Sequence, residues 1–270
     1  MHRHIARAFA LALMTVAFVP ASASAAGAIH PGVQTFTAGA QCTSNFVFSD
    51  GGTTYLGQAA HCSGTGAATD TDGCSSESLP IGTPVDVTGA SKPGTLVYNS
   101  WITMQSKHEA NADTCAYNDL ALVRIDPADA GNVDPTVPGF GGPTGVAEAP
   151  TSSGATVFSY GNSELRGGVA QLSPKQGAVV TNEGGGWSRT VYTATPGVPG
   201  DSGSGFMDDS GHAIGVLSTL QVLPVAGSNG VGDLARELAY MRANSSFSGV
   251  NLVNGTKAFN GDLVGAIAGE

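Results

Sequence analysis

Positive charge is scarce in this sequence. Only 11 of the 270 residues are Lys or Arg, against 21 Asp or Glu, and the formal net charge is −10 at pH 7. A surface with so few cations lacks the basic patches that bind nucleic acid or an anionic membrane. We therefore expect neither nucleic acid nor membrane as a partner.

Long apolar runs are missing beyond the N-terminus, where no segment approaches the ~20 residues needed to span a bilayer. Residues 1–26 combine a basic start, an apolar stretch over 8–19 and small residues over 21–26. This pattern is typical of a secretory signal peptide, and cleavage after Ala25 or Ala26 fits the rule equally well. The sequence predicts a secreted, extracellular protein.

Cysteine is also rare. The four cysteines are Cys42, Cys62, Cys74 and Cys115, and none belongs to a C-x-x-C pair. In an exported chain they predict two disulfides, for which three pairings exist. The spacing does not favour zinc, and we expect no metal and no organic cofactor.

Helical periodicity is scarce, whereas glycine is abundant, with 39 residues. This composition favours short strands and many turns. The remaining length of about 240 residues suffices for one large all-β domain or two small ones that share a cleft. The best helix covers Asp233 to Ala243, where Leu234, Leu238 and Met241 fall on one face.

Strand-like segments fall into two groups. The first covers 45–48, 53–58, 85–88, 94–97 and 120–125, and the second covers 157–160, 178–181, 191–195 and 213–217. Residues 126–154, which are rich in Pro, Gly and Asp, are typical of a linker. We expect β-units over 27–125 and 155–231, then the helix and an extension over 232–270.

Ser202 lies in a glycine-rich run from Pro199 to Gly205. Glycine adopts backbone conformations that other residues rarely adopt. A turn built from glycines could therefore direct the N–H groups of Gly200 and Ser202 to one point beside the Ser202 hydroxyl. The negative oxygen of a tetrahedral intermediate would need stabilising at that point. A serine hydroxyl is a poor nucleophile at its usual pKa, so this interpretation requires a base and a group that orients the base. The alternative is a plain Gly/Ser surface loop.

Two other stretches supply such groups. His61 ends an apolar run beside Cys62, and Asp119 opens an alternating apolar strand. The motifs Ala-Ala-His-Cys, Asn-Asp-Leu-Ala-Leu and Gly-Asp-Ser-Gly occur in the order His, Asp, Ser, unlike the orders of α/β-hydrolases and subtilisins. In these motifs the chain resembles the chymotrypsin-like (trypsin-fold) serine proteases, particularly secreted bacterial ones.

The resemblance implies a fold and a disulfide pairing. The implied fold is all-β, with two six-stranded antiparallel Greek-key β-barrels, an active site in the cleft between them, and a C-terminal helix. The implied pairing joins Cys42 to Cys62, which holds the base in place, and leaves Cys74 with Cys115.

The resemblance also implies a site and an activity. The catalytic triad is His61, Asp119 and Ser202, the oxyanion hole is formed by the N–H groups of Gly200 and Ser202, and the hydroxyl of Ser218 supports the aspartate. The implied activity is that of a monomeric serine endopeptidase, which hydrolyses a peptide or protein substrate through an acyl-enzyme. The alternatives are an inactive trypsin-fold binding or adhesion protein and an esterase.

The sequence departs from the family in two places. It has no Ile-Val-Gly-Gly segment, so we expect no zymogen cleavage of the trypsinogen type. Asp201 then needs another cation, for which Arg166 and Arg189 are candidates. The alternative is that Asp201 is partly solvated and caps the turn. Pro196 falls where the family places the floor of the specificity pocket and Leu220 where many members carry glycine. With no acid at this floor, we expect small or apolar side chains at P1, the substrate residue before the cleaved bond.

Overall fold

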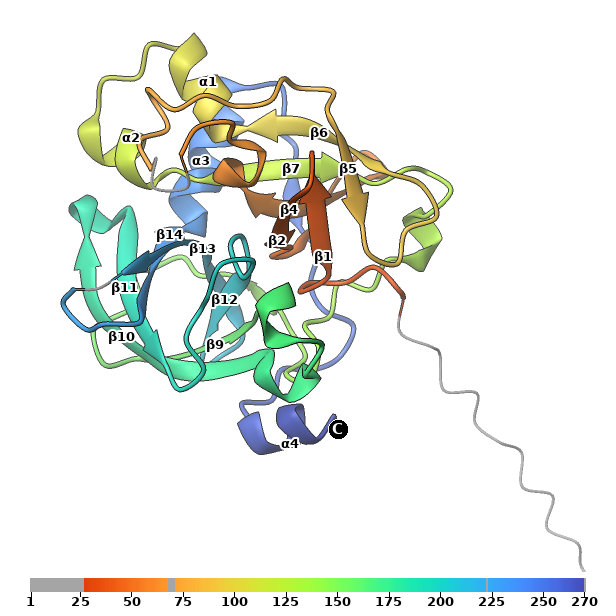
Figure 1. Ribbon diagram of the computed structural model, residues 1–270, viewed down its shortest axis with the longest axis vertical. Coiled ribbons are helices and arrows are strands. Elements are labelled where there is room, and N and C mark those ends of the chain that lie inside the picture. Colours follow the sequence, from red (N-terminus) through yellow and green to blue (C-terminus); the bar gives the residue numbers. More distant parts are fainter. Residues whose placement is uncertain (1–26, 68–70, 222, 270) are drawn as a thin grey trace, which may run out of the picture.

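Two β-sheets lie one above the other and make up most of the structure (Figure 1). The computed structural model describes residues 27–67, 71–221 and 223–269, and the predicted signal peptide over 1–26 lies outside this range. Both sheets are built from short strands joined by turns, as the glycine content predicts.

The first sheet has eight strands in the order β15-β3-β4-β7-β6-β5-β1-β2, and all neighbours are antiparallel. Its strands are β1 (Gln34–Thr37), β2 (Ala40–Thr43), β3 (Val47–Asp50), β4 (Thr53–Ala59), β5 (Pro84–Val87), β6 (Gly94–Asn99), β7 (Leu120–Arg124) and β15 (Asn251–Leu252). The hairpin of β3 and β4 shows how the sequence directs this sheet. Gly51 and Gly52 have φ angles of +54° and +86°, as the tight two-residue turn between paired Asp50 and Thr53 requires.

The second sheet has seven strands in the order β12-β9-β10-β11-β14-β13-β8. They are β8 (Gly145–Val146), β9 (Thr156–Tyr160), β10 (Pro174–Glu183), β11 (Ser188–Thr193), β12 (Gly205–Asp208), β13 (His212–Gln221) and β14 (Ser228–Asp233). An additional pairing of β12 with β13 closes six of them into an antiparallel barrel. The short β8 adds in parallel to β13, inside the segment predicted to be a linker.

The helices are few and short, except for one near the C-terminus. They are α1 (Ser100–Ser106), α2 (Ala112–Tyr117), α3 (Leu234–Asn244) and α4 (Leu263–Ala268), with 3-10 turns η1 (Ala60–Ser63), η2 (Ala130–Asn132), η3 (Glu164–Arg166), η4 (Ala170–Leu172) and η5 (Gly184–Gly186). Asp233 caps α3 by accepting the N–H of Arg236, and this helix confirms the one predicted. Helices α1, α2 and α4 were not predicted.

Buried apolar side chains join the two sheets to each other. One cluster contains Phe48 from the first sheet with Phe46 just before β3, Met207 from the second sheet, Leu238 from α3 and Val250 from the C-terminal extension. A second cluster fills the first sheet around Leu56 and Trp101, and a third fills the second sheet. The shared cluster holds the two sheets in the relative position on which the cleft between them depends.

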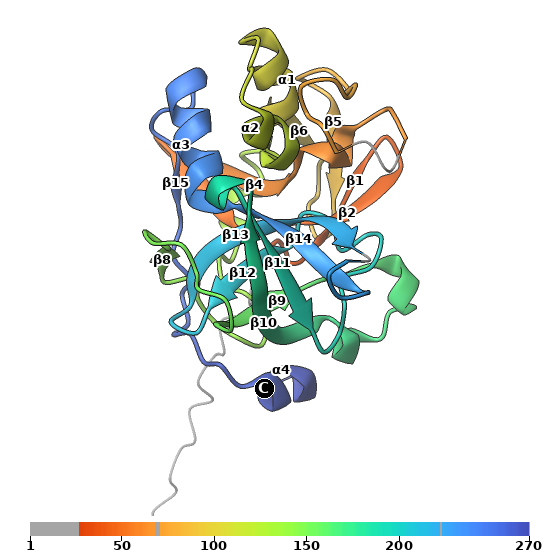
Figure 2. The same cartoon turned by 90° about the vertical axis from the view of Figure 1, so that its left-hand side faces the viewer.

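The C-terminal extension, residues 245–269, lies against both sheets (Figure 2). Its β15 adds to the edge of the first sheet beside β3, and Phe247 packs edge-on against Tyr55 with 5.8 Å between ring centroids. Further along, Phe259 packs in the same manner against Phe158 of β9, with centroids 5.3 Å apart. The extension therefore ties the two sheets together.

Candidate active site

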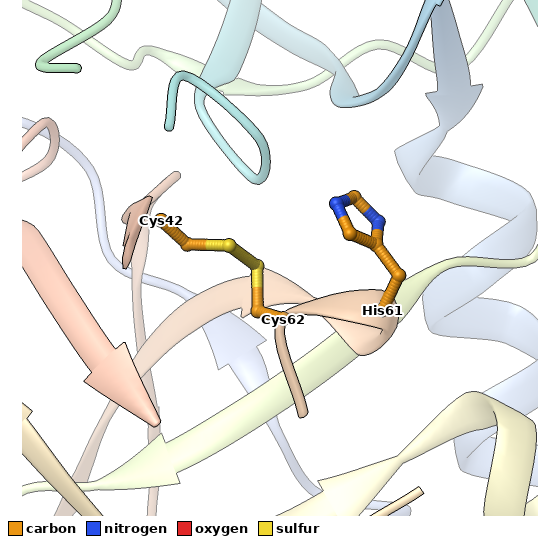
Figure 3. Close-up of side chains that lie close together, drawn as sticks. All are labelled: Cys42, His61 and Cys62. Atoms are coloured by element: carbon orange, nitrogen blue, oxygen red, sulfur yellow. A yellow bond between two sulfur atoms is a disulfide. The ribbon is translucent and has the colours of Figure 1, made fainter. Parts of the chain in front are cut away.

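His61 is held where β4 ends in the 3-10 turn η1. The neighbouring Cys62 forms a disulfide with Cys42 of β2, with an S–S distance of 2.05 Å, and the imidazole projects from the same turn beside this disulfide (Figure 3). Cys74 and Cys115 form the second disulfide, so the implied pairing is confirmed. The bridge ties the base to a second strand of the sheet.

Asp119 lies behind His61, between α2 and β7, and is 3% exposed. Its Oδ1 accepts the His61 backbone N–H at 2.9 Å. Its Oδ2 lies 2.6 Å from Nδ1 of His61 and also accepts the Ser218 hydroxyl at 2.6 Å. Because Oδ2 is an acceptor, Nδ1 carries the proton, which leaves Nε2 of the neutral ring free to accept one.

The electrostatic environment favours the protonated imidazole. Burial alone would lower the pKa of His61, but the charge of Asp119 and its hydrogen bond to the ring raise it, and the net effect is a pKa above the ordinary 6.5. His61 is therefore a stronger base than a free imidazole.

Ser202 lies on a turn that only glycine can make. Gly200 and Gly203 have φ angles of +94° and +89°, and a Cβ at Gly203 would lie 2.6 Å from the Thr43 carbonyl oxygen. Thr43 donates its N–H to the Ser202 carbonyl at 2.8 Å, while Gly203 donates to the Leu217 carbonyl at 2.7 Å. Both sheets thus fix the backbone of Ser202.

Two amides beside Ser202 remain available. Among the residues that the structure describes, the N–H groups of Gly200 and Ser202 donate to no acceptor. The Gly200 carbonyl is occupied, because it accepts from the Thr43 hydroxyl at 2.7 Å and from Nε2 of Gln41 at 3.0 Å. The turn therefore offers two unsatisfied donors, and an anion is the natural acceptor for such a pair.

The three side chains of the expected triad meet at one cleft. His61, Asp119 and Ser202 line a cavity of about 570 Å³, together with Trp101, whose ring centroid is 6.5 Å from that of His61. In the described part of the chain, no hydrogen bond joins the His61 ring to the Ser202 hydroxyl. The base and its orienting carboxylate are paired, and Ser202 opens onto the same space.

Comparison with known proteins identifies this architecture. No protein-family model matches the chain, and no curated protein matches it in sequence. The solved structure of protease A (TFPA) of Thermobifida fusca is similar, with a TM-score of 0.54 and 19% sequence identity over 84% of this chain and 99% of that chain. The chain has the trypsin-like two-barrel fold. A Nocardiopsis protease (NAPase) aligns over 83% of this chain and 98% of its own at 16% identity and a TM-score of 0.49.

In this trypsin-like fold, the buried Asp201 next to the serine is paired with two cations. Its Oδ2 contacts Nη2 of Arg166 and lies 3.0 Å from Nζ of Lys175, while Oδ1 accepts the Ser163 N–H at 3.0 Å. Of the two candidate arginines, Arg166 is therefore the partner, whereas Arg189 pairs with Asp233. Lys175 was missed, because a lysine at the start of a strand is usually solvated.

The surroundings of Lys175 alter its acidity. Its side chain is 0% exposed. Burial lowers the pKa of Lys175 to about 8, and the charge of Arg166 acts in the same direction, while Asp201 opposes both. The turn that carries Ser202 is thus anchored by a cation that titrates in mildly alkaline solution.

Beyond Ser202, the trypsin-like cleft continues into a mainly apolar pocket. Ser218 and Leu220 line it. Pro196 is not among the described lining residues, and its carbonyl instead accepts from Arg166 at 3.0 Å. The sequence missed Asn229, whose amide accepts the Gly197 N–H at 2.9 Å and donates to the Gly197 and Thr219 carbonyls, each at 3.3 Å.

Proposed function

We propose that this protein is a serine endopeptidase that uses His61, Asp119 and Ser202 as its catalytic triad. One observation carries the proposal: the Asp119 carboxylate accepts Nδ1–H of His61 at 2.6 Å on the wall of the cleft that Ser202 also lines. The trypsin-like fold, shared with a bacterial protease, supports the same conclusion. Fold alone does not define an activity, so the arrangement of these side chains is the stronger argument.

The reaction follows from this arrangement. His61 takes the hydroxyl proton of Ser202 through Nε2 while Oγ bonds to the carbonyl carbon of the peptide. The protonated imidazole then gives that proton to the departing amine, and the C–N bond breaks to leave an acyl-enzyme. Water attacks the ester with His61 again as the base, which releases the acid and restores Ser202. Asp119 stays ionised and stabilises the imidazolium.

The free amides of Gly200 and Ser202 act on the oxygen of the attacked carbonyl. This oxygen becomes negative in the tetrahedral intermediate, and two aligned N–H donors stabilise it more than they stabilise the neutral substrate. Loss of one such donor raises the barrier by ~2.7–4 kcal/mol in comparable sites.

The pocket beside Ser202 suits small or apolar P1 side chains. Leu217, Leu220 and Val198 contribute apolar surface to it. Asn229 carries no charge, is 1% exposed, and has its amide bound to backbone groups, so it would not pair with a basic or acidic side chain.

We also propose that the protein acts outside the cell. The two disulfides are stable in an oxidising compartment, and the predicted signal peptide accounts for export. Among the described helices, none has the length and apolarity to cross a bilayer.

Labelling with a fluorophosphonate tests the proposed function. The probe should modify Ser202 covalently, while Ser202→Ala should remain unlabelled and lose roughly 10⁶-fold in turnover of an Ala- or Leu-containing chromogenic peptide. An unlabelled wild-type protein would indicate a binding module, whereas labelling with hydrolysis of esters but not of peptides would indicate an esterase.

A further inference from the structure

Glu237 is a charged residue type in the middle of an apolar helix face. It lies on α3 together with Leu234, Leu238 and Met241, and all four are buried. The side chain of Glu237 is 0% exposed, although glutamate is rarely buried without a partner. Apolar packing therefore does not explain why a glutamate occupies this buried position.

The carboxyl group of Glu237 lies directly behind Asp119. Its Oε1 accepts the Asp119 backbone N–H at 2.9 Å in a buried contact. On the other side of the same peptide group, the Asn118 carbonyl accepts the Ser100 hydroxyl at 2.8 Å. The carbonyl and the N–H of the peptide group between Asn118 and Asp119 are thus both bound by helix side chains, one from α1 and one from α3.

The second sheet leaves room for this carboxyl group. A Cβ at Gly232 of β14 would lie 2.6 Å from Oε1 of Glu237. A side chain at this position would force the carboxyl group of Glu237 to shift. The contact therefore depends on α3, β14 and the start of β7 together.

We propose that Glu237 is a positioning residue, whose Oε1 fixes the Asp119 backbone and thereby the direction from which the Asp119 carboxylate meets His61. This inference rests on the role proposed for Asp119. Glu237 lines no part of the described cleft, so it acts only through Asp119. A displacement of ~1 Å in a catalytic group costs about 100-fold in rate in comparable enzymes.

The surroundings of Glu237 favour its neutral, protonated form. Burial raises its pKa well above the ordinary value, and the carboxylates of Asp119 and Asp233 raise it further, against the opposing effects of the Asp119 N–H and Arg189. The cation of Arg189 is committed to Asp233. Tyr98 of β6 is a further titratable group close to Glu237. Oε2 has no hydrogen-bond partner among the described residues, which a carboxylate would tolerate less than a protonated carboxyl group.

Neutrality matters here because a second negative charge behind Asp119 would repel its carboxylate. An uncharged acceptor holds the amide without this cost. Glutamine has the same shape and offers the same carbonyl oxygen, whereas leucine offers no acceptor. Glu237→Gln therefore removes only the charge that the side chain could carry, whereas Glu237→Leu also removes the hydrogen bond.

The test compares Glu237→Gln and Glu237→Leu by the NMR titration of the His61 ring and by kcat/KM on an Ala-containing peptide. Glu237→Gln should leave both within about twofold of wild type, since a neutral acceptor remains. Glu237→Leu should lower kcat/KM by ~10- to 100-fold and lower the pKa of His61, because the Asp119 carboxylate moves away. Leu238→Ala, buried on the same face, is the matched control: it should reduce the melting temperature and leave the His61 titration in place.

Two results would overturn the proposal. One is an unchanged His61 titration in Glu237→Leu, and the other is a fall in the pKa of His61 in Glu237→Gln, which would mean that Glu237 acts through its charge. If Glu237→Leu does not fold, the Glu237→Gln titration decides alone, with no change as the supporting result. If the wild type lacks peptidase activity, the proposed function fails, while the titrations still decide whether Glu237 positions Asp119.

Discussion

The hydroxyl of Ser218 lies 2.6 Å from Oδ2 of Asp119, although the two residues are 99 positions apart in sequence. Ser218 belongs to β13 of the second sheet, and Asp119 precedes β7 of the first. The hydrogen bond therefore joins the two sheets at the point where the carboxylate also binds His61.

The first prediction concerns this bond. Ser218→Ala removes one of the two donors to Oδ2 of Asp119, and hydrogen bonds to charged groups contribute ~1.5–3 kcal/mol. We expect kcat/KM to fall by roughly 10-fold or more, measured on an Ala-containing chromogenic peptide. The exposed Ser246 provides the same substitution as a control, and Ser246→Ala should have no effect. Equal rates in the two variants would contradict the prediction.

The second prediction concerns pH. The raised pKa of His61 means that the ring remains protonated, and unable to act as a base, to a higher pH than free imidazole. The acid limb of the kcat/KM profile should therefore lie above 6.5, the ordinary value. Asp119→Asn should move that limb to lower pH and reduce kcat strongly, by ~10⁴-fold in comparable enzymes. An acid limb below 6.5 in the wild type would contradict the assignment.

The third prediction concerns Lys175. Its pKa of about 8 in the folded protein, against 10.5 for the ordinary group, means that the unfolded chain binds one more proton between these values. The free energy of unfolding should thus rise with pH in this window, by about 1.4 kcal/mol per pH unit from this group.

Urea unfolding at several pH values tests this effect. Lys175→Met should lack the rise that the wild type shows between pH 8 and 10.5, whereas Lys107→Met, at an exposed lysine, should retain it. Parallel curves for the wild type and Lys175→Met would show that the buried lysine keeps its proton.

The fourth prediction separates the two disulfides. Their sequence separations are 20 and 41 residues, which correspond to roughly 3 and 4 kcal/mol of stabilisation in the chain-entropy model. Replacing either pair with alanine should lower the free energy of unfolding by a similar amount. Only the Cys42→Ala, Cys62→Ala double variant should also lower kcat at a temperature where both variants are folded, because Cys62 adjoins His61.

The fifth prediction concerns specificity. Leu220 lines the pocket and is 54% exposed, so its removal should not disturb the core. Leu220→Gly should raise kcat/KM for a Phe-containing peptide relative to an Ala-containing one, because the pocket widens. A Phe-to-Ala ratio equal to that of the wild type would show that Leu220 does not limit the pocket.

The three side chains that meet at the cleft could be singled out from the sequence, because each lies in a short local motif. His61 with Cys62, Asp119 before its strand and Ser202 among glycines each occur in a distinctive sequence. Their coordinates bring them to one cavity, and the expected fold is confirmed.

The supporting groups were not predictable in the same way. Lys175 starts a strand, and Glu237 lies in the first turns of a helix, where an acid is favourable in solvent. Their burial depends on distant elements that close over them. For Glu237 the available signal was its place between Leu234 and Leu238 on an otherwise apolar face.

The unpredicted helices α1 and α2 have a different cause. Both are short, and each begins with a side-chain cap: Asn99 accepts the N–H groups of Trp101 and Ile102, and Asn111 accepts that of Thr114. Their apolar pattern is too brief to show a helical period, so the two asparagines were the available signal.

The contact of β15 with β3 has a consequence for how the molecule is made. Residues 251–252 supply the outermost strand of a sheet whose other members all come from the first 124 residues. Residues 251–252 must therefore leave the ribosome before that sheet acquires its last strand. The seven strands from the first 124 residues cannot reach the final form of this sheet as soon as they are synthesised, because their edge strand follows every strand of the second sheet in the chain.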